Sequence, residues 1–269
     1  MATVLDRIVE KKWEEIAIAK TRRDLNSLRE AVHVAPEIRN FLTPLRAPGH
    51  VQLIAEVKKA SPSKGMIRPQ FEPVTIAKEY ESGGAAAISC LTDEPFFQGR
   101  IDYLTAIRAA VNIPVLRKDF ILDEYQVYEA RVAGADAVLL IAECLEGAKL
   151  NELYQAIIEL GMTALIEFYD PKNLTRVLDT GTKLVGVNNR DLHTFAVELA
   201  HVINLRKDIP SDVCLVAESG IFTSADVKRL YDANIDAMLV GESLMRQHDV
   251  RQAVKNLIEF DRFDGGLED

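Results

Sequence analysis

The sequence has few cysteines and no long apolar segment. Its three cysteines, Cys90, Cys144 and Cys214, are odd in number, far apart and placed in or near apolar runs, so we expect buried, reduced thiols. No apolar run approaches the roughly 18 residues that span a bilayer, and the N-terminus lacks the hydrophobic core of a signal peptide. These absences predict a cytoplasmic protein that has no membrane partner.

An excess of positive charge is absent as well. The 269 residues include 32 Lys and Arg against 41 Asp and Glu, which gives a net charge of −9 and a pI near 5.2. Because such a chain is poorly suited to nucleic acid, we expect no nucleic-acid partner. Carboxylates and histidines nowhere cluster at ligand spacing, so we expect no metal, and we also expect no cofactor. We expect a monomer, with a weak homo-oligomer as the alternative.

Short apolar runs recur along the whole chain. Four of them end in charged or polar residues (51–58, 113–119, 162–167 and 213–220), and four others alternate with these (85–90, 136–141, 183–188 and 236–241). Amphipathic stretches of helical length separate the runs, as expected for buried parallel strands joined by helices. Eight such units predict an α/β fold, a (β/α)8 TIM barrel, in which reactive side chains gather at the carboxyl ends of the strands.

Residues 1–48 precede the first of these runs. Leu5, Ile8, Trp13 and Ile16 recur at helical spacing, so we expect an N-terminal helical extension packed on the barrel. We expect it to cover one end of the barrel, with a contribution to the substrate pocket as the alternative. Residues 49–260 would form the catalytic barrel, and the acidic, glycine-containing residues 261–269 a disordered tail.

Four charged residues are predicted to meet at the mouth of the barrel. Glu56 and Lys58 lie two apart in the first strand and therefore point to the same face, while Lys118 ends the third strand and Glu167 the fifth. A structural ion pair is one interpretation of the first two. Buried charge is costly in an interior that is normally apolar, however, which favours catalysis. Such a cluster can hold one acid and one ionised base at neutral pH.

Glycines at the ends of the last two strands predict a phosphate site. The steps AESGI (217–221) and VGESL (240–244) each place a Gly where a strand gives way to a helix, and exposed backbone N–H groups at a helix start bind phosphate. Relief of crowding would explain one such step, but two occur in adjacent units. The segment 61–71 after the first strand is either a solvated connection or a mobile lid over a phosphorylated ligand.

Several motifs lie in order at barrel spacing: AEVKKASPSKG (55–65), FFQG (96–99), LRKDFI (116–121), LIE (165–167), GVNNRDL (186–192), AESGI and GESLMR (241–246). Together they resemble the indole-3-glycerol-phosphate synthase family of tryptophan biosynthesis, in its monofunctional form. The resemblance implies a carboxy-lyase. Its substrate would be a phosphorylated anthranilate-sugar, 1-(2-carboxyphenylamino)-1-deoxyribulose 5-phosphate, converted to indole-3-glycerol phosphate, carbon dioxide and water.

The resemblance also implies roles for individual residues. Lys118 would be the general acid and Glu167 the general base, while Glu56 and Lys58 orient the substrate and assist proton transfer. The other implied site residues are Asn188 and Arg190 at the same mouth, Ser61 in the lid, Phe97 and Phe120 around the anthranilate ring, Glu218 at a strand end, and Ser219, Gly220, Gly241 and Glu242 around the phosphate. Glu242 stands where the family frequently has a small hydroxyl residue, which leaves its backbone as the expected contact.

Two alternatives come from other classes of protein. In a Schiff-base aldolase on a similar barrel, Lys118 would attack a carbonyl covalently, which leaves Glu56 and Lys58 without a task. A non-catalytic phosphosugar-binding protein would need neither Lys118 nor Glu167. Borohydride trapping of substrate on Lys118 would indicate the aldolase. Substitutions of Lys118 and Glu167 that leave function unchanged would indicate the binding protein.

Overall fold

Eight parallel strands close into a barrel in the computed structural model, which describes residues 3–191 and 196–259. Each strand pairs with the next one along the chain, and β1 pairs with β10 to close the ring. The strands are β1 (Gln52–Val57), β4 (Ala87–Leu91), β5 (Val115–Lys118), β6 (Ala137–Ile141), β7 (Thr163–Phe168), β8 (Leu184–Asn188), β9 (Cys214–Glu218) and β10 (Ala237–Val240). The predicted (β/α)8 barrel is confirmed.

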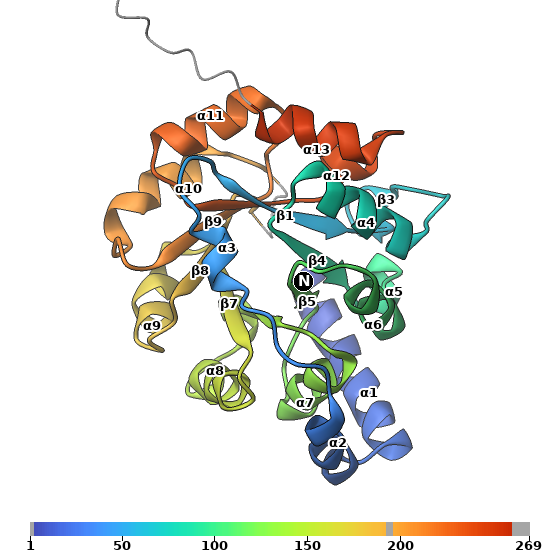
Figure 1. Ribbon diagram of the computed structural model, residues 1–269. Helices are drawn as coiled ribbons and strands as arrows, with labels where there is room; N and C mark the ends of the chain where they lie inside the picture. The colour runs from blue at the N-terminus through green and yellow to red at the C-terminus, as the bar shows by residue number, and fades with distance from the viewer. Residues whose placement is uncertain (1–2, 192–195, 260–269) are drawn as a thin grey trace, which may run out of the picture.

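Helices surround the barrel (Figure 1). They are α4 (Pro73–Gly83), α6 (Ile101–Ala110), α7 (Glu124–Ala133), α8 (Lys149–Glu159), η3 (Pro171–Asn173) with α9 (Leu174–Leu178), α10 (Ala200–Leu205) with η4 (Arg206–Asp208), α11 (Ser224–Asp232) and α13 (Val250–Ile258). Short elements interrupt some loops after the strands: α5 (Glu94–Phe97), η2 (Ala142–Cys144) and α12 (Glu242–Met245). None of the helices in the described residues is long and apolar enough to cross a membrane.

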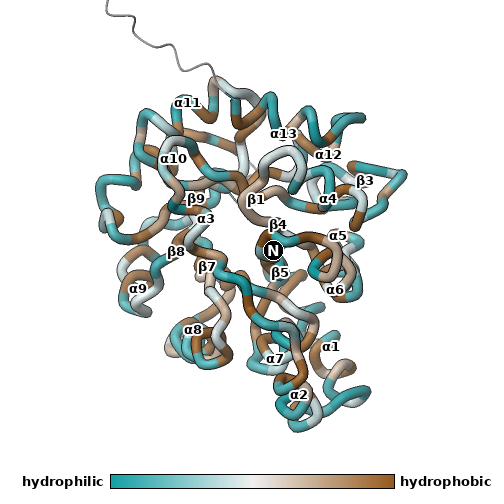
Figure 2. The backbone as a smooth tube through the Cα atoms, viewed as in Figure 1, coloured by the Kyte–Doolittle hydropathy of each residue, from teal (hydrophilic) through white to brown (hydrophobic). Residues whose placement is uncertain are grey.

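Local sequence signals account for most helix ends. Asp123 and Thr223 cap α7 and α11 with reciprocal side-chain hydrogen bonds, and Pro73 occupies the first turn of α4. Gly84 and Gly134 end α4 and α7 in left-handed conformations that a side chain would disfavour. Teal and brown residues alternate along these helices in Figure 2, as expected for helices with one polar and one apolar side.

The core has two parts, one inside the barrel and one between the strands and the helices. Leu116, Leu165 and Val216 belong to the interior part, whereas Val185 and Leu215 point outward to the helices. The two sets alternate along each strand, as the pleat requires. All three cysteines are free, and Cys90 and Cys214 are buried.

Four helical segments precede β1: α1 (Val4–Arg22), α2 (Leu25–Ala31), η1 (Val32–Val34) and α3 (Leu42–Leu45). Phe41 and Leu45 are completely buried and join the interior cluster, together with residues that begin strands, such as Ala87 and Ala137. The short helix α3, and not α1, therefore closes the amino-terminal end of the barrel, in front of the strands in Figure 1. The boundary between residues 1–48 and 49–260 stays a prediction, and the predicted tail, 261–269, lies outside the described residues.

The segment 61–71 contains regular structure that its sequence did not indicate. It begins with an antiparallel hairpin of β2 (Ala60–Ser61) and β3 (Gly65–Met66), and Ile67 beyond it is buried in the core. Arg68 donates to the carbonyl oxygens of Met245 and Gln247, at 3.2 and 2.7 Å. Two short strands of two residues each give no readable alternation, which is why the sequence indicated a connection without regular structure.

Candidate active site

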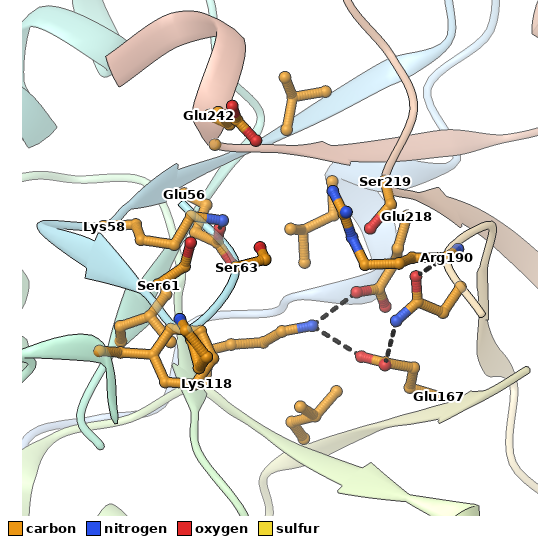
Figure 3. A pocket seen from close by; sticks show the side chains of 18 of the residues that line it. Glu56, Lys58, Ser61, Ser63, Lys118, Glu167, Arg190, Glu218, Ser219 and Glu242 are labelled. Atoms are coloured by element: carbon orange, nitrogen blue, oxygen red, sulfur yellow. Dashed lines mark hydrogen bonds and ion pairs between the residues drawn. The ribbon is translucent and has the colours of Figure 1, made fainter. Parts of the chain in front are cut away.

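A cavity lies at the carboxyl ends of the barrel strands. All the site residues named from the sequence line it: Glu56, Lys58, Ser61, Phe97, Lys118, Phe120, Glu167, Asn188, Arg190, Glu218, Ser219, Gly220, Gly241 and Glu242. Figure 3 shows polar and charged side chains converging from opposite walls, with Lys58 and Ser61 on one side and Arg190 and Ser219 on the other. The barrel fold thus brings together groups that are far apart in the sequence.

Lys118 is the centre of the polar part of this cavity. Its ammonium, at the end of β5, lies 2.7 Å from Glu167 Oε2 on β7 and 2.5 Å from Glu218 Oε2 on β9 (Figure 3). Both carboxylates are almost fully buried. A buried ammonium held by two carboxylates is oriented by charge as well as by hydrogen bonds. Its Nζ atom is therefore fixed at the cavity wall.

The three groups differ in pKa. Burial lowers the pKa of the Lys118 ammonium, but the carboxylates around it, first of all Glu167, outweigh burial and raise that pKa above its ordinary value. Burial would raise the pKa of Glu167, yet Lys118 outweighs it and lowers that pKa. For Glu218, burial and the neighbouring Glu167 raise the pKa to about 8. At neutral pH the cluster therefore favours a charged lysine and an ionised Glu167, and Glu218 keeps its proton to a higher pH than an ordinary carboxyl group.

Asn188 and its neighbours fix the geometry of Glu167 and of the end of β9. Asn188 Nδ2 donates to Glu167 Oε1 at 2.9 Å, and its own Oδ1 accepts from the backbone N–H of Arg190 at 3.0 Å. Asn189 points away from the cavity: its side chain donates to the Ser219 carbonyl oxygen at 3.1 Å. Sequence reasoning singled out Asn188 and missed Asn189, since alternation alone does not show which of two adjacent amides faces the site.

A second ion pair lies on β1. Lys58 and Glu56 are joined by a short hydrogen bond, as their spacing on one face of the strand predicted. Glu56 is buried, and a Cβ at Gly241 would collide with its carboxylate. Gly186 leaves space for the Glu218 carboxylate in the same way. These two glycines therefore make room for the acidic side chains, a function that the sequence did not indicate.

One wall of the cavity is apolar. The rings of Phe97 and Phe120 lie 6.1 Å apart between centroids, and Leu139 and Ile141 of β6 line the same region. The first turns of α1 complete the wall with Val4, Leu5 and Ile8. The N-terminal helix thus contributes to the pocket, which was the alternative to a cover. Helical periodicity predicted the packed face of α1 correctly for Ile8 and Ile16 and wrongly for Trp13, which is 46% exposed. It did not show the surface against which the helix packs.

Glycine turns form the end of the cavity after β9 and β10. Ser219 and Gly220 both have positive φ, 65° and 80°, so the chain turns sharply as it leaves β9. Gly241 leads directly into α12, and Ser243 Oγ donates to the Ile221 carbonyl oxygen at 3.1 Å, which joins the two turns. The Glu242 carboxylate pairs with Arg246 at 3.1 Å. The Glu242 side chain thus pairs within its own helix region, and its backbone is the part that can contact a ligand.

The fold and the site define a class. This is a (β/α)8-barrel enzyme with an acid–base cluster in a cavity that has one apolar wall and one end made of glycine turns. Within the described residues, no group of three or more His, Cys, Asp or Glu side chains could hold a metal ion.

Comparison with known proteins gives the family. The family model for indole-3-glycerol phosphate synthase matches residues 5–257, and the chain belongs to that family. An indole-3-glycerol phosphate synthase from Rhodopirellula baltica is 56% identical over 256 residues, which cover 95% of this chain and 99% of the relative. Another, from a Polaromonas species, is 48% identical over 97% of this chain and 100% of the relative.

Solved structures agree on the fold alone. An N-acetylmannosamine-6-phosphate 2-epimerase from Clostridium perfringens has a TM-score of 0.60 at 15% identity, over 77% of this chain and 92% of that chain. A thiamine phosphate pyrophosphorylase from Pyrococcus furiosus has a TM-score of 0.59 at 16% identity, over 77% of this chain and 93% of that chain.

Proposed function

We propose that the protein converts 1-(2-carboxyphenylamino)-1-deoxyribulose 5-phosphate to indole-3-glycerol phosphate, with Lys118 as general acid and Glu167 as general base. The observation that carries the assignment is the position of Lys118 Nζ, within 2.7 Å of two buried carboxylates on other strands. An acid and a base are thus available at one point in the cavity. The family membership of the chain supports the reaction itself.

Ring closure is the first difficult step, because an aromatic carbon is a weak nucleophile. As that carbon bonds to the substrate ketone carbon, the ketone oxygen gains negative charge and takes a proton. The Lys118 ammonium supplies this proton, and the surrounding carboxylates restrain it in place. Because the pKa of Glu218 is raised, Glu167 carries most of the negative charge beside the lysine at neutral pH.

Decarboxylation and dehydration complete the indole ring. The carboxylate on the ring carbon that made the attack leaves as carbon dioxide, and its bonding electrons return to the ring. The hydroxyl then departs as water, which requires a proton for the leaving oxygen and removal of a proton from the ring side. Ionised Glu167 accepts that proton, and Lys58, paired with Glu56, is the second cation for the departing hydroxyl or the substrate carboxylate.

The two ends of the cavity fix the orientation of the substrate. The anthranilate ring lies against the apolar wall of Phe97 and Phe120, and the phosphate binds the backbone of Ser219, Gly220, Gly241 and Glu242. Arg190 and Ser61, which also line the cavity, contact the polar middle of the substrate. This orientation sets the ketone oxygen beside Lys118 Nζ.

The pKa of Lys118 argues against the Schiff-base alternative. A lysine that attacks a carbonyl must be a neutral amine, and such lysines have a lowered pKa. Here the carboxylates raise the pKa and keep the side chain charged. Borohydride should therefore trap no substrate on Lys118.

The decisive test is direct turnover. Purified protein mixed with the carboxyphenylamino-deoxyribulose phosphate should produce indole fluorescence, and Glu167→Gln should reduce the rate by about a hundredfold, the usual scale for a lost acid or base. Folded wild-type protein that yields no indole product would overturn the proposal. If Glu167→Gln keeps the wild-type rate and both limbs of the pH–rate profile, the base lies elsewhere and Glu56 is the next candidate.

We further propose a cytoplasmic monomer whose partner is the small phosphorylated substrate and not a nucleic acid. The net charge of −9 supports this, because the cationic groups of the cavity are local exceptions on an acidic chain. Light scattering at several concentrations tests the monomer, and a mass that doubles with concentration would replace it with a homodimer.

A further inference from the structure

Helix α1 carries a lysine that is buried almost completely. Lys12 is 4% exposed, although its neighbours Lys11 and Trp13 are exposed to solvent. Lysine is rarely buried unless its charge is paired, and Lys12 Nζ lies 2.7 Å from Glu15 Oε2 on its own helix and 2.9 Å from both Asp93 Oδ2 and Asp119 Oδ1. Burial lowers the pKa of Lys12, but Asp119 and Asp93 outweigh burial and raise it. The ammonium is therefore charged, and it joins α1 to the ends of two barrel strands.

The first of these aspartates shapes the loop after β4. Asp93 Oδ1 accepts from the Phe96 N–H at 2.9 Å and so caps α5, and the Asp93 carbonyl oxygen accepts from the Gly99 N–H at 2.8 Å. These bonds bend the loop around α5, which carries Phe97. The orientation of the Phe97 ring therefore depends on the carboxylate that Lys12 contacts.

The second aspartate follows the proposed general acid. Asp119 Oδ1 accepts from the N–H of Phe120 at 2.8 Å, and its Oδ2 accepts from the Thr92 hydroxyl at 2.5 Å. Asp119 is adjacent to Lys118 and holds the residue that forms the other half of the ring cleft. Lys12 thus touches, through two carboxylates, both segments from which Phe97 and Phe120 extend.

The same helix supplies part of the ring cleft directly. Ile8 lies one turn before Lys12 on the same face of α1, and Ile8, Leu5 and Val4 line the cavity with the two phenylalanines. A displacement of α1 would therefore move the apolar wall as well as release the two aspartates. The glycine turns after β9 and β10 lie in other units of the barrel, whereas the ion pairs of Lys12 join α1 to the ends of β4 and β5.

We propose that Lys12 is a positioning residue for the anthranilate ring. Its ion pairs with Asp93 and Asp119 hold the three parts of the cleft, α1, Phe97 and Phe120, in fixed positions relative to one another. The inference rests on the proposed function, because it takes the anthranilate part of that substrate as the occupant of the cleft. It predicts that loss of the Lys12 charge harms ring recognition selectively and leaves phosphate recognition intact.

The test uses Lys12→Met, with Lys11→Met as the matched control on the exposed side of the same helix. Binding of anthranilate and of inorganic phosphate is measured separately, and turnover is measured with the complete substrate. Lys12→Met should weaken anthranilate binding and lower kcat/KM by roughly tenfold each, the effect of a misplaced reactant, while phosphate affinity stays within about twofold. Lys12→Arg keeps the charge and should restore most of both losses, and Lys11→Met should behave as wild type.

A second variant keeps the test decisive where Lys12→Met fails to fold. Lys12→Met/Asp93→Asn removes one of the three carboxylates, Glu15, Asp93 and Asp119, that lie within 2.9 Å of the lost ammonium, and the amide oxygen that it introduces can still cap α5. Equal losses of anthranilate and phosphate affinity, or no loss of either, would overturn the proposal in whichever variant folds. Wild-type protein that binds anthranilate and phosphate but makes no indole product would instead refute the proposed function, and the binding measurements would still decide the role of Lys12.

Discussion

The two ends of the barrel are closed by opposite chemistry. At the amino-terminal end, Phe41 and Leu45 fill the interior with completely buried apolar side chains. At the carboxyl end, Lys118, Glu167 and Glu218 occupy the interior with ionisable side chains whose charged forms burial alone would disfavour. The comparison indicates that stability and chemistry are separated along the barrel axis. Substitutions at one end should mainly change the free energy of unfolding, and those at the other mainly the rate.

The largest expected effect is on stability at the apolar end. Phe41→Ala should lower the free energy of unfolding by about 3–5 kcal/mol, because it opens a cavity in a packed interior. Turnover per folded molecule should change by less than about twofold, since the proposed catalytic groups lie at the other end. Chemical denaturation and the indole assay measure the two quantities.

The matched control is Phe222→Ala, at a side chain that is 56% exposed at the carboxyl end. It should cost less than about 0.5 kcal/mol of stability. If the loss of turnover per folded molecule in Phe41→Ala, expressed as activation free energy, equals its loss of unfolding free energy, then stability and chemistry are not separated between the two ends.

At the charged end, Lys118→Met should reverse this pattern. Turnover should fall by at least about a hundredfold, equivalent to about 2.7 kcal/mol of activation free energy, while substrate affinity is largely retained. Lys172→Met, at a lysine whose side chain is 91% exposed, is the control. A Lys118→Met enzyme that keeps most of its turnover would remove the residue from the acid role.

The charged end should also make stability depend on pH. The pKa of Glu218 is about 8 in the folded state and 4.5 as its ordinary value, so the folded protein binds more protons between these values. Its contribution to stability is therefore lost as the pH rises from 4.5 through 8, at no more than about 1.4 kcal/mol per pH unit for one proton. Denaturation at about pH 6 and about pH 8.5, on either side of the folded-state pKa, should show a larger decline for wild type than for Glu218→Gln. Equal declines would mean that Glu218 is ionised throughout. Phe41→Ala should instead lower the free energy of unfolding by the same amount at both pH values.

The smallest expected effect concerns the glycine turn after β9. Gly220 has a φ of 80°, and a Cβ there would collide with Val197, so Gly220→Ala should disturb the turn that is proposed to bind phosphate. We expect roughly tenfold weaker binding of inorganic phosphate. Gly181→Ala is the matched control, because Gly181 has a φ of 83° in open space away from the cavity. Equal phosphate affinity in the two variants would locate the anion elsewhere.

The sequence predicted the barrel and its charged mouth because both follow from short-range periodicity. Alternation within β1 puts Glu56 and Lys58 on one face, and strands of equal direction bring Lys118 and Glu167 to the same end. The short helix α3 could not be predicted in this way. Four residues in a proline-containing stretch have no helical period, and their burial depends on the barrel that forms around them.

The remaining features could not be predicted, because they depend on residues that are far apart in the sequence and meet only in the fold. The raised pKa of Glu218 arises from burial beside Glu167 on another strand, which no local pattern in the sequence encodes. Lys12 is similar, because a lysine on an amphipathic helix usually belongs to a solvated face. Its role depends on Asp93 and Asp119, far along the chain.

The contacts between the first and last units of the barrel bear on the order in which a ribosome completes the molecule. β1 pairs with β10, α4 packs on α13, and Arg68 of the hairpin segment donates to Met245 and Gln247. A nascent chain that ends before β10 leaves one edge of β1 unpaired and lacks the carbonyl groups that hold Arg68. The cavity wall that carries Glu56 and Lys58 is therefore synthesised early, but its contacts with the last barrel unit can form only near the end of translation. Translation should release a competent site only after the final strand has emerged.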